Sequence, residues 1–318
     1  NEVSGGQGTL AGFNILVQKL PGHFDLIFTK DSPHYVSLPG ISVLVGGMWV
    51  MHLSYWGFNQ YIIQRGLAAK STSEAQKGLV FAAFLKMVMP IIIVLPGVAA
   101  AVLSPNLDPA DKAYPTVMNL LPTGVLGLVF AALIAAIISS LASMMNSIST
   151  IFTMDLYRHL NTKEKSEKQL VTVGRTVSLF AMITAMIIAK PLLGNFEQVF
   201  QYIQEFTGFF TPGVCALFLL GFFWSKTTAN GALATAIGSA VFSIAFKLWW
   251  PELPFIDRVG IVFLMCIAVG VGVSVIQGAK PHPGAIDYDE IDTTTSTGFN
   301  LASLVVVLML IALYATWW

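Results

Sequence analysis

The sequence predicts an all-α polytopic membrane protein. Of its 318 residues, 55% are hydrophobic and only 11% are charged, whereas soluble domains carry about 25% charged residues. Apolar runs of about 20 residues, long enough to cross the hydrocarbon core as helices, recur along the chain. These runs predict about eight transmembrane helices, at residues 40–63, 78–103, 124–155, 170–193, 196–224, 230–250, 257–277 and 298–318.

Three parts of this pattern need separate explanations. Residues 1–39 mix polar and apolar side chains, which predicts an extramembrane segment with one interfacial helix. The run at 124–155 is too long for a helix perpendicular to the membrane, so it should tilt or protrude. Residues 278–297 are polar and acidic and should link the last two spans.

The basic residues of the loops predict the orientation in the membrane, because cytoplasmic loops carry an excess of Lys and Arg. Residues 64–77 and 156–169 hold much of this excess and should lie in the cytoplasm, with both termini outside. The predicted cytoplasmic residues are Arg65, Lys70, Lys77, Arg158, Lys163, Lys165, Lys168, Arg175, Lys226 and Lys280. The other side holds Lys19, Lys30, Lys112, Lys190 and Arg258.

Net charge and cysteine content exclude other classes of protein. The formal net charge is zero, so nothing indicates a nucleic-acid partner. Cys215 and Cys266 both lie in apolar runs, without the spacing of a disulfide framework or a metal site. They are expected to be buried, inert thiols.

One lysine interrupts the second run, VFAAFLKMVMPIII at residues 80–93. Lys86 has no acidic residue within one helical turn, and an ionisable residue inside a span indicates a functional site. The alternative is a side chain that reaches outward to the interface, but about nine apolar residues separate Lys86 from the loop. Lys247 also lies within a span, near a Trp-Trp-Pro end where it can reach the interface.

Small polar residues line one face of the third run. Ala136, Ser139, Ser140 and Ser143 follow i, i+3, i+4, i+7 spacing and therefore share a helical face. Hydroxyl and carbonyl oxygens are hard ligands that suit an alkali cation. The alternative is that small residues permit close helix packing and that the serines bond to their own helix.

The fifth run carries two further candidates. Phe200 and Gln204 lie four residues apart on one face, and Thr211-Pro212-Gly213 interrupts the run, since Pro lacks a backbone donor. Gln204 suits either a substrate or hydrogen bonding between helices, and the residues leave both open.

The first run contains His52, Tyr55, Trp56 and Asn59 at helical spacing. Aromatic faces beside hydrogen-bonding groups suit sugars, whose C–H faces stack while their hydroxyls bond. The alternative is an interfacial aromatic belt, although His52 and Tyr55 are deep in the run for that.

Several segments together resemble the sodium/solute symporter family, most of all its bacterial sodium/galactose symporters. The segments that carry the resemblance include YWGFNQYIIQR, FAALIAAIISSLASMMNS, FQYIQEFTG and FWSKTTANGA. The resemblance implies the leucine-transporter-type fold, with two inverted five-helix repeats around a central site. In that scheme residues 40–224 form the second repeat, residues 225–318 form accessory helices, and the chain is a fragment without the first repeat.

The resemblance also implies roles for individual residues. Lys86 and Gln204 match sugar-binding positions, Tyr55 matches the aromatic residue that closes the sugar site, and Phe200 matches a hydrophobic gate. The residues that match the sodium ligands are Ala136, Ser139 and Ser140. His52 is a departure, because the galactose symporters have asparagine at this position.

The function implied is sodium-coupled uptake of a galactose- or glucose-like sugar across the cell inner membrane, without enzyme activity. The partners would be the sugar, the co-transported sodium ion and the lipid bilayer, and no nucleic acid. Three alternatives remain. One is a sodium symporter for another organic solute, such as a sugar acid or carboxylate. Another is an intramembrane hydrolase that uses Ser139 or Ser140 with Lys86, and the third is a sensor with a transporter-like module.

Overall fold

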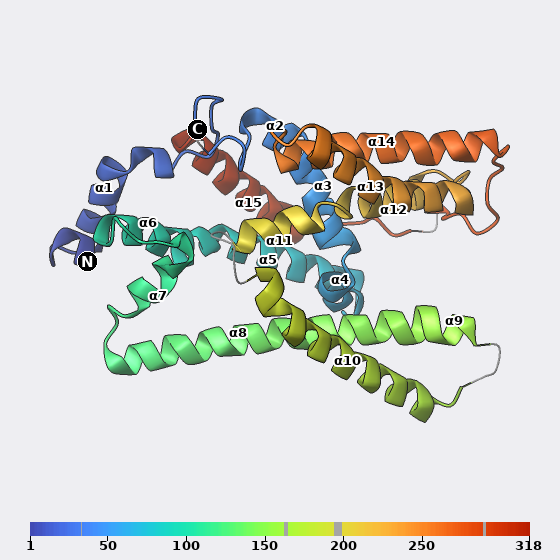
Figure 1. Ribbon diagram of the computed structural model, residues 1–318, viewed down its shortest axis with the longest axis horizontal. Helices are drawn as coiled ribbons and strands as arrows, with labels where there is room; N and C mark the ends of the chain where they lie inside the picture. Colours follow the sequence, from blue (N-terminus) through green and yellow to red (C-terminus); the bar gives the residue numbers. More distant parts are fainter. Residues whose placement is uncertain (33, 162–164, 194–198, 289–290) are drawn as a thin grey trace. The chain divides into compact units, whose positions relative to one another are not determined.

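The computed structural model describes residues 1–32, 34–161, 165–193, 199–288 and 291–318, and every regular element within these ranges is a helix (Figure 1). This confirms the all-α prediction. The chain divides into two compact units, which are treated separately below. The first unit consists of Asn1–Asn59, Gly66–Val98 and Phe200–Trp318, and the second of Gln60–Arg65 and Ala99–Val199.

The α-helices of the first unit are α1 (Thr9–Lys19), α2 (Gly40–Val45), α3 (Gly47–Leu53), α5 (Thr72–Ile92), α11 (Val199–Thr207), α12 (Thr211–Phe223), α13 (Ala229–Trp249), α14 (Phe255–Ile276) and α15 (Thr297–Thr316). Those of the second unit are α7 (Ala113–Met118), α8 (Thr123–Thr150), α9 (Arg158–Leu160) and α10 (Glu167–Leu193). Three helices have residues in both units: α4 (Gln60–Leu67), α6 (Val94–Leu103) and α11, whose first residue Val199 belongs to the second unit.

The helices confirm the predicted membrane spans. Within the described residues, 7 helical segments are long and apolar enough to cross a membrane, and the bent pair α11–α12 raises the number to 8. The segments are Gly40–Phe58, Thr72–Leu103, Thr123–Leu160, Glu167–Pro191, Ala229–Trp249, Phe255–Ile276 and Thr297–Thr316. The predicted long third span has 38 residues. Residues 196–198 of the predicted fifth span and Lys163 lie outside the described residues.

The outward-facing apolar surface of these helices indicates what surrounds them. The most apolar stretches of Thr72–Leu103, Thr123–Leu160 and Thr297–Thr316 contribute no buried residue to the structure. A soluble monomer rarely exposes apolar surface on this scale. Because each helix satisfies its own backbone hydrogen bonds, these segments suit the hydrocarbon core. The chain is a multi-pass membrane protein.

The first span is not one continuous helix. α2 ends at Val45, and the Trp49 indole donates a hydrogen bond to the Leu44 carbonyl in its last turn. α3 continues into a π-helix at Ser54–Phe58, after which Asn59 is extended, with φ −87° and ψ 115°. α3 also crosses α14 very closely, because a Cβ on Gly47 would lie 1.8 Å from the Ile256 carbonyl oxygen. Only glycine permits this approach.

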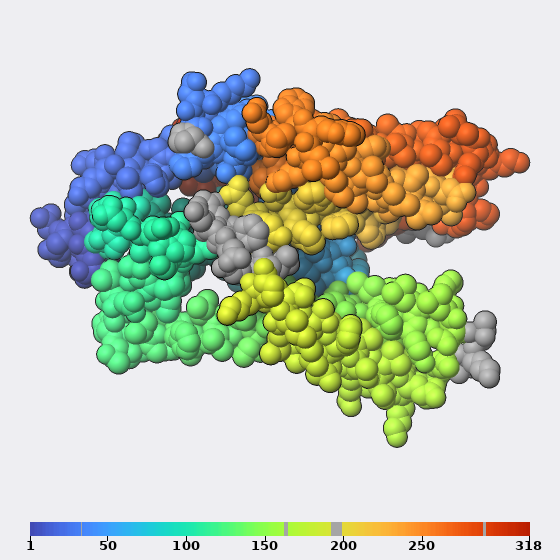
Figure 2. All heavy atoms as spheres, viewed as in Figure 1, coloured from blue at the N-terminus to red at the C-terminus, as the bar shows by residue number. Residues whose placement is uncertain are grey.

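The core of the first unit lies where α3, α12, α13 and α14 meet (Figure 1). One buried cluster joins Val50, Cys215 and Val259, and a neighbouring cluster joins Ala216, Val262 and Cys266. The yellow to orange atoms of α12–α14 form a continuous surface in the space-filling view (Figure 2). Both cysteines are buried and free, which confirms their predicted burial.

A serine on α13 stabilises the bend between α11 and α12. The two helices meet at 40°, and the predicted triplet Thr211-Pro212-Gly213 forms the first turn of α12. The buried Ser239 hydroxyl accepts a hydrogen bond from the Gly213 N–H and donates one to the Phe209 carbonyl, each at 2.9 Å. Backbone groups that the interruption leaves without a helical partner thus find one on the neighbouring helix.

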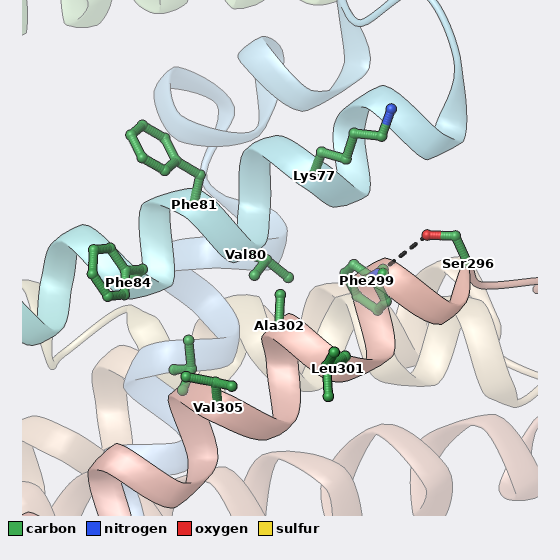
Figure 3. A pocket seen from close by; sticks show the side chains of 11 residues that line it. Lys77, Val80, Phe81, Phe84, Ser296, Phe299, Leu301, Ala302 and Val305 are labelled. Atoms are coloured by element: carbon green, nitrogen blue, oxygen red, sulfur yellow. Dashed lines mark hydrogen bonds between the residues drawn. The ribbon is translucent and has the colours of Figure 1, made fainter.

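The structure also describes most of residues 1–39 and 278–297, and the extramembrane location of residues 1–39 stays a prediction. The single α-helix of residues 1–39 is α1, among the residues described, and its interfacial position stays a prediction. The described part of the linker at 278–297 has no long helix, and it contacts α5 through a 3.1 Å hydrogen bond from Gln76 Nε2 to the Thr294 carbonyl. At the start of α15, the Ser296 hydroxyl accepts a hydrogen bond from the Phe299 N–H. α15 then packs along α5, with Ala302 facing Val80 (Figure 3).

The second unit is built on the packing of α8 against α10 (Figure 1). The Ser178 hydroxyl of α10 donates a hydrogen bond to the Met145 carbonyl of α8 at 3.3 Å. α4 attaches to α8 through two further bonds, from Asn146 Nδ2 to Gln64 Oε1 at 3.0 Å and from Arg65 Nη2 to Ser143 Oγ at 2.6 Å. Polar side chains therefore join helices whose surfaces are otherwise apolar.

Candidate functional site

Lys86 lies beside the aromatic segment of the first span. Its ammonium nitrogen is 5.7 Å from the centroid of the Trp56 ring, a distance at which the ring face attracts a cation. The exposed lysine of α5 is thereby placed with Trp56, a member of the predicted aromatic and polar face.

The aromatic face itself is carried by the π-helix. The Tyr55 and Trp56 rings meet edge to face, with centroids 5.4 Å apart. Tyr55 is 38% exposed and His52 is also exposed, so both side chains are accessible to a ligand. The expected α-helical repeat to Asn59 was wrong, because the π-helix and the extended backbone that follows place Asn59 outside that repeat.

The remaining substrate candidates lie on α11. Phe200 is 75% exposed, and Gln204 is half-buried. The adjacent face of the same helix makes polar contacts: Gln201 Nε2 donates to Ser37 Oγ at 2.9 Å, and the Glu205 carboxylate accepts from Arg258 Nη2 at 2.8 Å. Glu205 also pairs with Lys247, which was expected only to reach the interface.

Two contributors were missed in the sequence. Trp56 was grouped with the aromatic face but was not expected to contact Lys86, and the partners of Glu205 were not identified. The only sequence signal for the partners of Glu205 was a charge pattern: Glu205, Lys247 and Arg258 are each rare charges in or beside apolar runs. Such charges are expected to pair with one another, although their sequence separation hides which ones do.

The candidate sodium ligands lie in the second unit. Ala136, Ser139 and Ser140 are exposed on α8, like the residues around them, and their i, i+3, i+4 spacing places them on one face. Ser143 differs from them, because its hydroxyl donates to the Ser139 carbonyl at 2.9 Å and accepts from Arg65. Among the described residues there is no group of three His, Cys, Asp or Glu side chains that suits a metal such as zinc. The oxygens of α8 instead suit a hard alkali ion.

The sequence comparisons decide the family. A model of the sodium:solute symporter family matches residues 10–238. The chain belongs to this family. The match covers the first span, Lys86, α8 and α11, and so every residue to which the resemblance assigns a role.

Three relatives are also similar to this chain over long stretches. A sodium/glucose cotransporter of Vibrio parahaemolyticus is 45% identical over 99% of this chain and 61% of its own length. An uncharacterized symporter of Escherichia coli is 32% identical over 85% of this chain and 48% of its own length. The human sodium/myo-inositol cotransporter 2 is 41% identical over 61% of this chain and 31% of its own length. The chain thus spans less than two thirds of the length of these relatives.

Proposed function

We propose that this family member is a sodium-coupled sugar symporter of the cell inner membrane. The observation that carries the proposal is the position of Lys86, an ammonium within an apolar span, beside the Trp56 ring. An ammonium has three donors and no acceptor, which suits the lone pairs of neighbouring hydroxyls. The Trp56 ring face next to it adds a surface on which a polyhydroxylated ring can stack.

The names of the relatives support the same chemistry. Glucose and myo-inositol, after which two of them are named, are six-membered rings that carry several adjacent hydroxyl groups. In the proposed site, Lys86, Gln204, Tyr55 and His52 bind the sugar, and Phe200 covers it. Because residues 40–224 are proposed to form an inverted repeat, its helices would rock around this site during transport.

Sodium supplies the energy in this proposal. The Ala136 carbonyl and the Ser139 and Ser140 hydroxyls would bind the ion together with ligands from elsewhere in the transporter. Each positive charge that moves inward gains about 2.3 kcal/mol per 100 mV of membrane potential. The protein would perform no covalent chemistry, so Lys86 is proposed as a ligand and not as a general base.

Uptake into proteoliposomes tests the proposal. Radiolabelled glucose and galactose should accumulate when an inward sodium gradient is imposed, and accumulation should stop when potassium replaces sodium. Lys86→Ala should abolish this uptake, since it removes three hydrogen-bond donors from the site. Lys77→Ala is the matched control, because Lys77 lies on the same helix in an exposed ion pair with Glu74.

Two results would contradict the proposal. Sodium-driven accumulation of a carboxylate or sugar acid without any uptake of neutral sugar would establish the alternative solute class. Full sugar uptake by Lys86→Ala, at normal protein levels in the liposomes, would remove Lys86 from the site.

A further inference from the structure

A group of charged and aromatic side chains holds the half-helix α11 against α13 and α14. The Glu205 cluster consists of Glu205 of α11, Lys247 of α13, Arg258 of α14 and Phe209 at the bend. Glu205 pairs with both cations, and the Arg258 guanidinium carbon lies 5.1 Å from the centroid of the Phe209 ring. No candidate role in sodium or sugar binding uses these residues.

The burial of Arg258 makes its partner Glu205 the central member of this cluster. The Arg258 side chain is only 3% exposed, compared with 25% for Glu205 and 46% for Lys247. Arg258 lies in the first turn of α14, where the helix dipole disfavours a positive charge. Its Nε atom has no hydrogen-bond partner among the described residues. The Glu205 carboxylate therefore supplies the charge that lets Arg258 remain buried.

The cluster fixes the rotation of α11. Gln201, Glu205 and Gly208 follow i, i+4, i+7 spacing and form one side of the segment. All three are held: Gln201 bonds Ser37, Glu205 bonds Arg258, and a Cβ on Gly208 would lie 3.3 Å from a Val259 methyl group. Phe200 and Gln204 directly precede Gln201 and Glu205 in the chain. Their side chains therefore point about 100° away from the contacting side of the helix.

We propose that Glu205 is a positioning residue for the sugar site: by binding Arg258 and Lys247, it sets the direction in which Gln204 and Phe200 point. This inference rests on the proposed function, because it assumes that Gln204 contacts the sugar. The bend that follows α11 separates the orientation of this short helix from that of α12. Ser239 fixes the Phe209 backbone at the bend, so the Glu205 cluster determines the orientation of α11.

Uptake kinetics in proteoliposomes test this proposal. Glu205→Gln should raise the KM for sugar about tenfold, which corresponds to about 1.4 kcal/mol, with the maximal rate per transporter changed by less than about twofold. Lys247→Met should have a smaller effect, since it leaves the Glu205–Arg258 pair in place. Glu74→Gln is the matched control, because it removes a carboxylate from an exposed ion pair on α5 and should leave KM unchanged.

A second variant separates positioning from folding. Glu205→Gln leaves a buried arginine without its partner and is expected to lower thermal stability. The double variant Glu205→Gln with Arg258→Met removes the unpaired charge, so it should regain stability but keep the raised KM. Recovery of both stability and KM would overturn the proposal, because Glu205 would then only balance charge.

Cysteine labelling provides a readout that needs no transport. Gln201→Cys lies on the held side of α11 and is half-buried, and the native Cys215 and Cys266 are buried. A water-soluble maleimide should react several times faster with this cysteine when Glu205→Gln is also present. An unchanged labelling rate together with an unchanged KM would overturn the role of Glu205. Normal sugar affinity in Gln204→Ala would instead contradict the proposed site and leave the labelling result valid.

Discussion

At the scale of single residues, Lys86 and Arg258 show two ways of holding a cation within an apolar segment. Lys86 is exposed and faces the Trp56 ring, a contact worth about 0.5–2 kcal/mol. Arg258 is 2% exposed and is paired with a carboxylate, and removing one partner of such a pair costs about 3–5 kcal/mol. The exposed cation is therefore accessible to solvent or a ligand, whereas the buried one is held in its ion pair.

His52 is expected to influence which sugar hydroxyls are recognised. Its imidazole differs in volume and in donor geometry from the asparagine of the galactose symporters, and the side chain is exposed. Sites that bond a hydroxyl discriminate strongly against analogues that lack it. Competition of labelled-sugar uptake by a panel of deoxy-sugars should give different rankings for the native protein and His52→Asn. Identical rankings would show that His52 does not contact the sugar.

Ser140 is expected to be a sodium ligand, and Ser143 provides the control. Ser140→Ala should lower sodium-driven uptake at least about tenfold and weaken sugar binding as well, because coupling between the two ligands is reciprocal. Ser143→Ala should have a much smaller effect, since that hydroxyl is already engaged with the Ser139 carbonyl and Arg65. The effect of each substitution is measured as the change in the sodium concentration that gives half-maximal uptake. Equal effects of the two substitutions would contradict the assignment.

At the scale of elements, run length and composition were enough to predict the helices, and three details were not accessible. A π-helix has the same composition as an α-helix, so nothing at Ser54–Phe58 indicated it. Ser239 resembles Ser243, the other serine of α13, and only packing shows that it bonds the bend. The partners of Glu205 are 42 and 53 residues away in the chain. Local patterns predict local structure, while these contacts depend on how helices meet.

The bend between α11 and α12 is expected to depend on Ser239. Ser239→Ala would leave the Gly213 N–H and the Phe209 carbonyl without this partner and should lower stability by about 1–2 kcal/mol. Ser243→Ala is the matched control one turn later on α13. Its hydroxyl is equally buried but has no hydrogen-bond partner among the described residues, so its loss should be neutral or stabilising. Thermal unfolding in detergent compares the two, and equal midpoints would contradict the role of Ser239.

At the scale of the whole molecule, the family match confirms the resemblance drawn from short segments. It extends over residues 10–238 and leaves α14 and α15 to be explained by packing alone. α14 contacts α3, α12 and α13 and so belongs to the core of the first unit, whereas α15 packs along α5. The domain boundaries at residues 39 and 224 and the inverted repeat stay predictions.

The orientation of the chain in the membrane is testable by labelling. Lys70→Cys and Ser166→Cys should resist an impermeant thiol reagent in intact cells, because residues 64–77 and 156–169 are predicted to be cytoplasmic. Lys112→Cys should react, since it belongs to the opposite group. The buried native cysteines provide a low background. Reaction at positions 70 and 166 but not at 112 would reverse the predicted orientation.

The π-helix at Ser54–Phe58 has a consequence for chain length. A π-turn holds about one residue more than an α-turn, so it is equivalent to a one-residue insertion in an ordinary helix. Deleting Gly57, beside which a Cβ would meet nothing within 4 Å, should convert the segment to an α-helix and keep the span intact. The deletion would leave the residues after the segment at nearly the same orientation relative to His52 and would change the direction of the Tyr55 and Trp56 side chains within it. A shortened protein that folds normally but no longer transports sugar would show that the extra residue serves recognition and not stability.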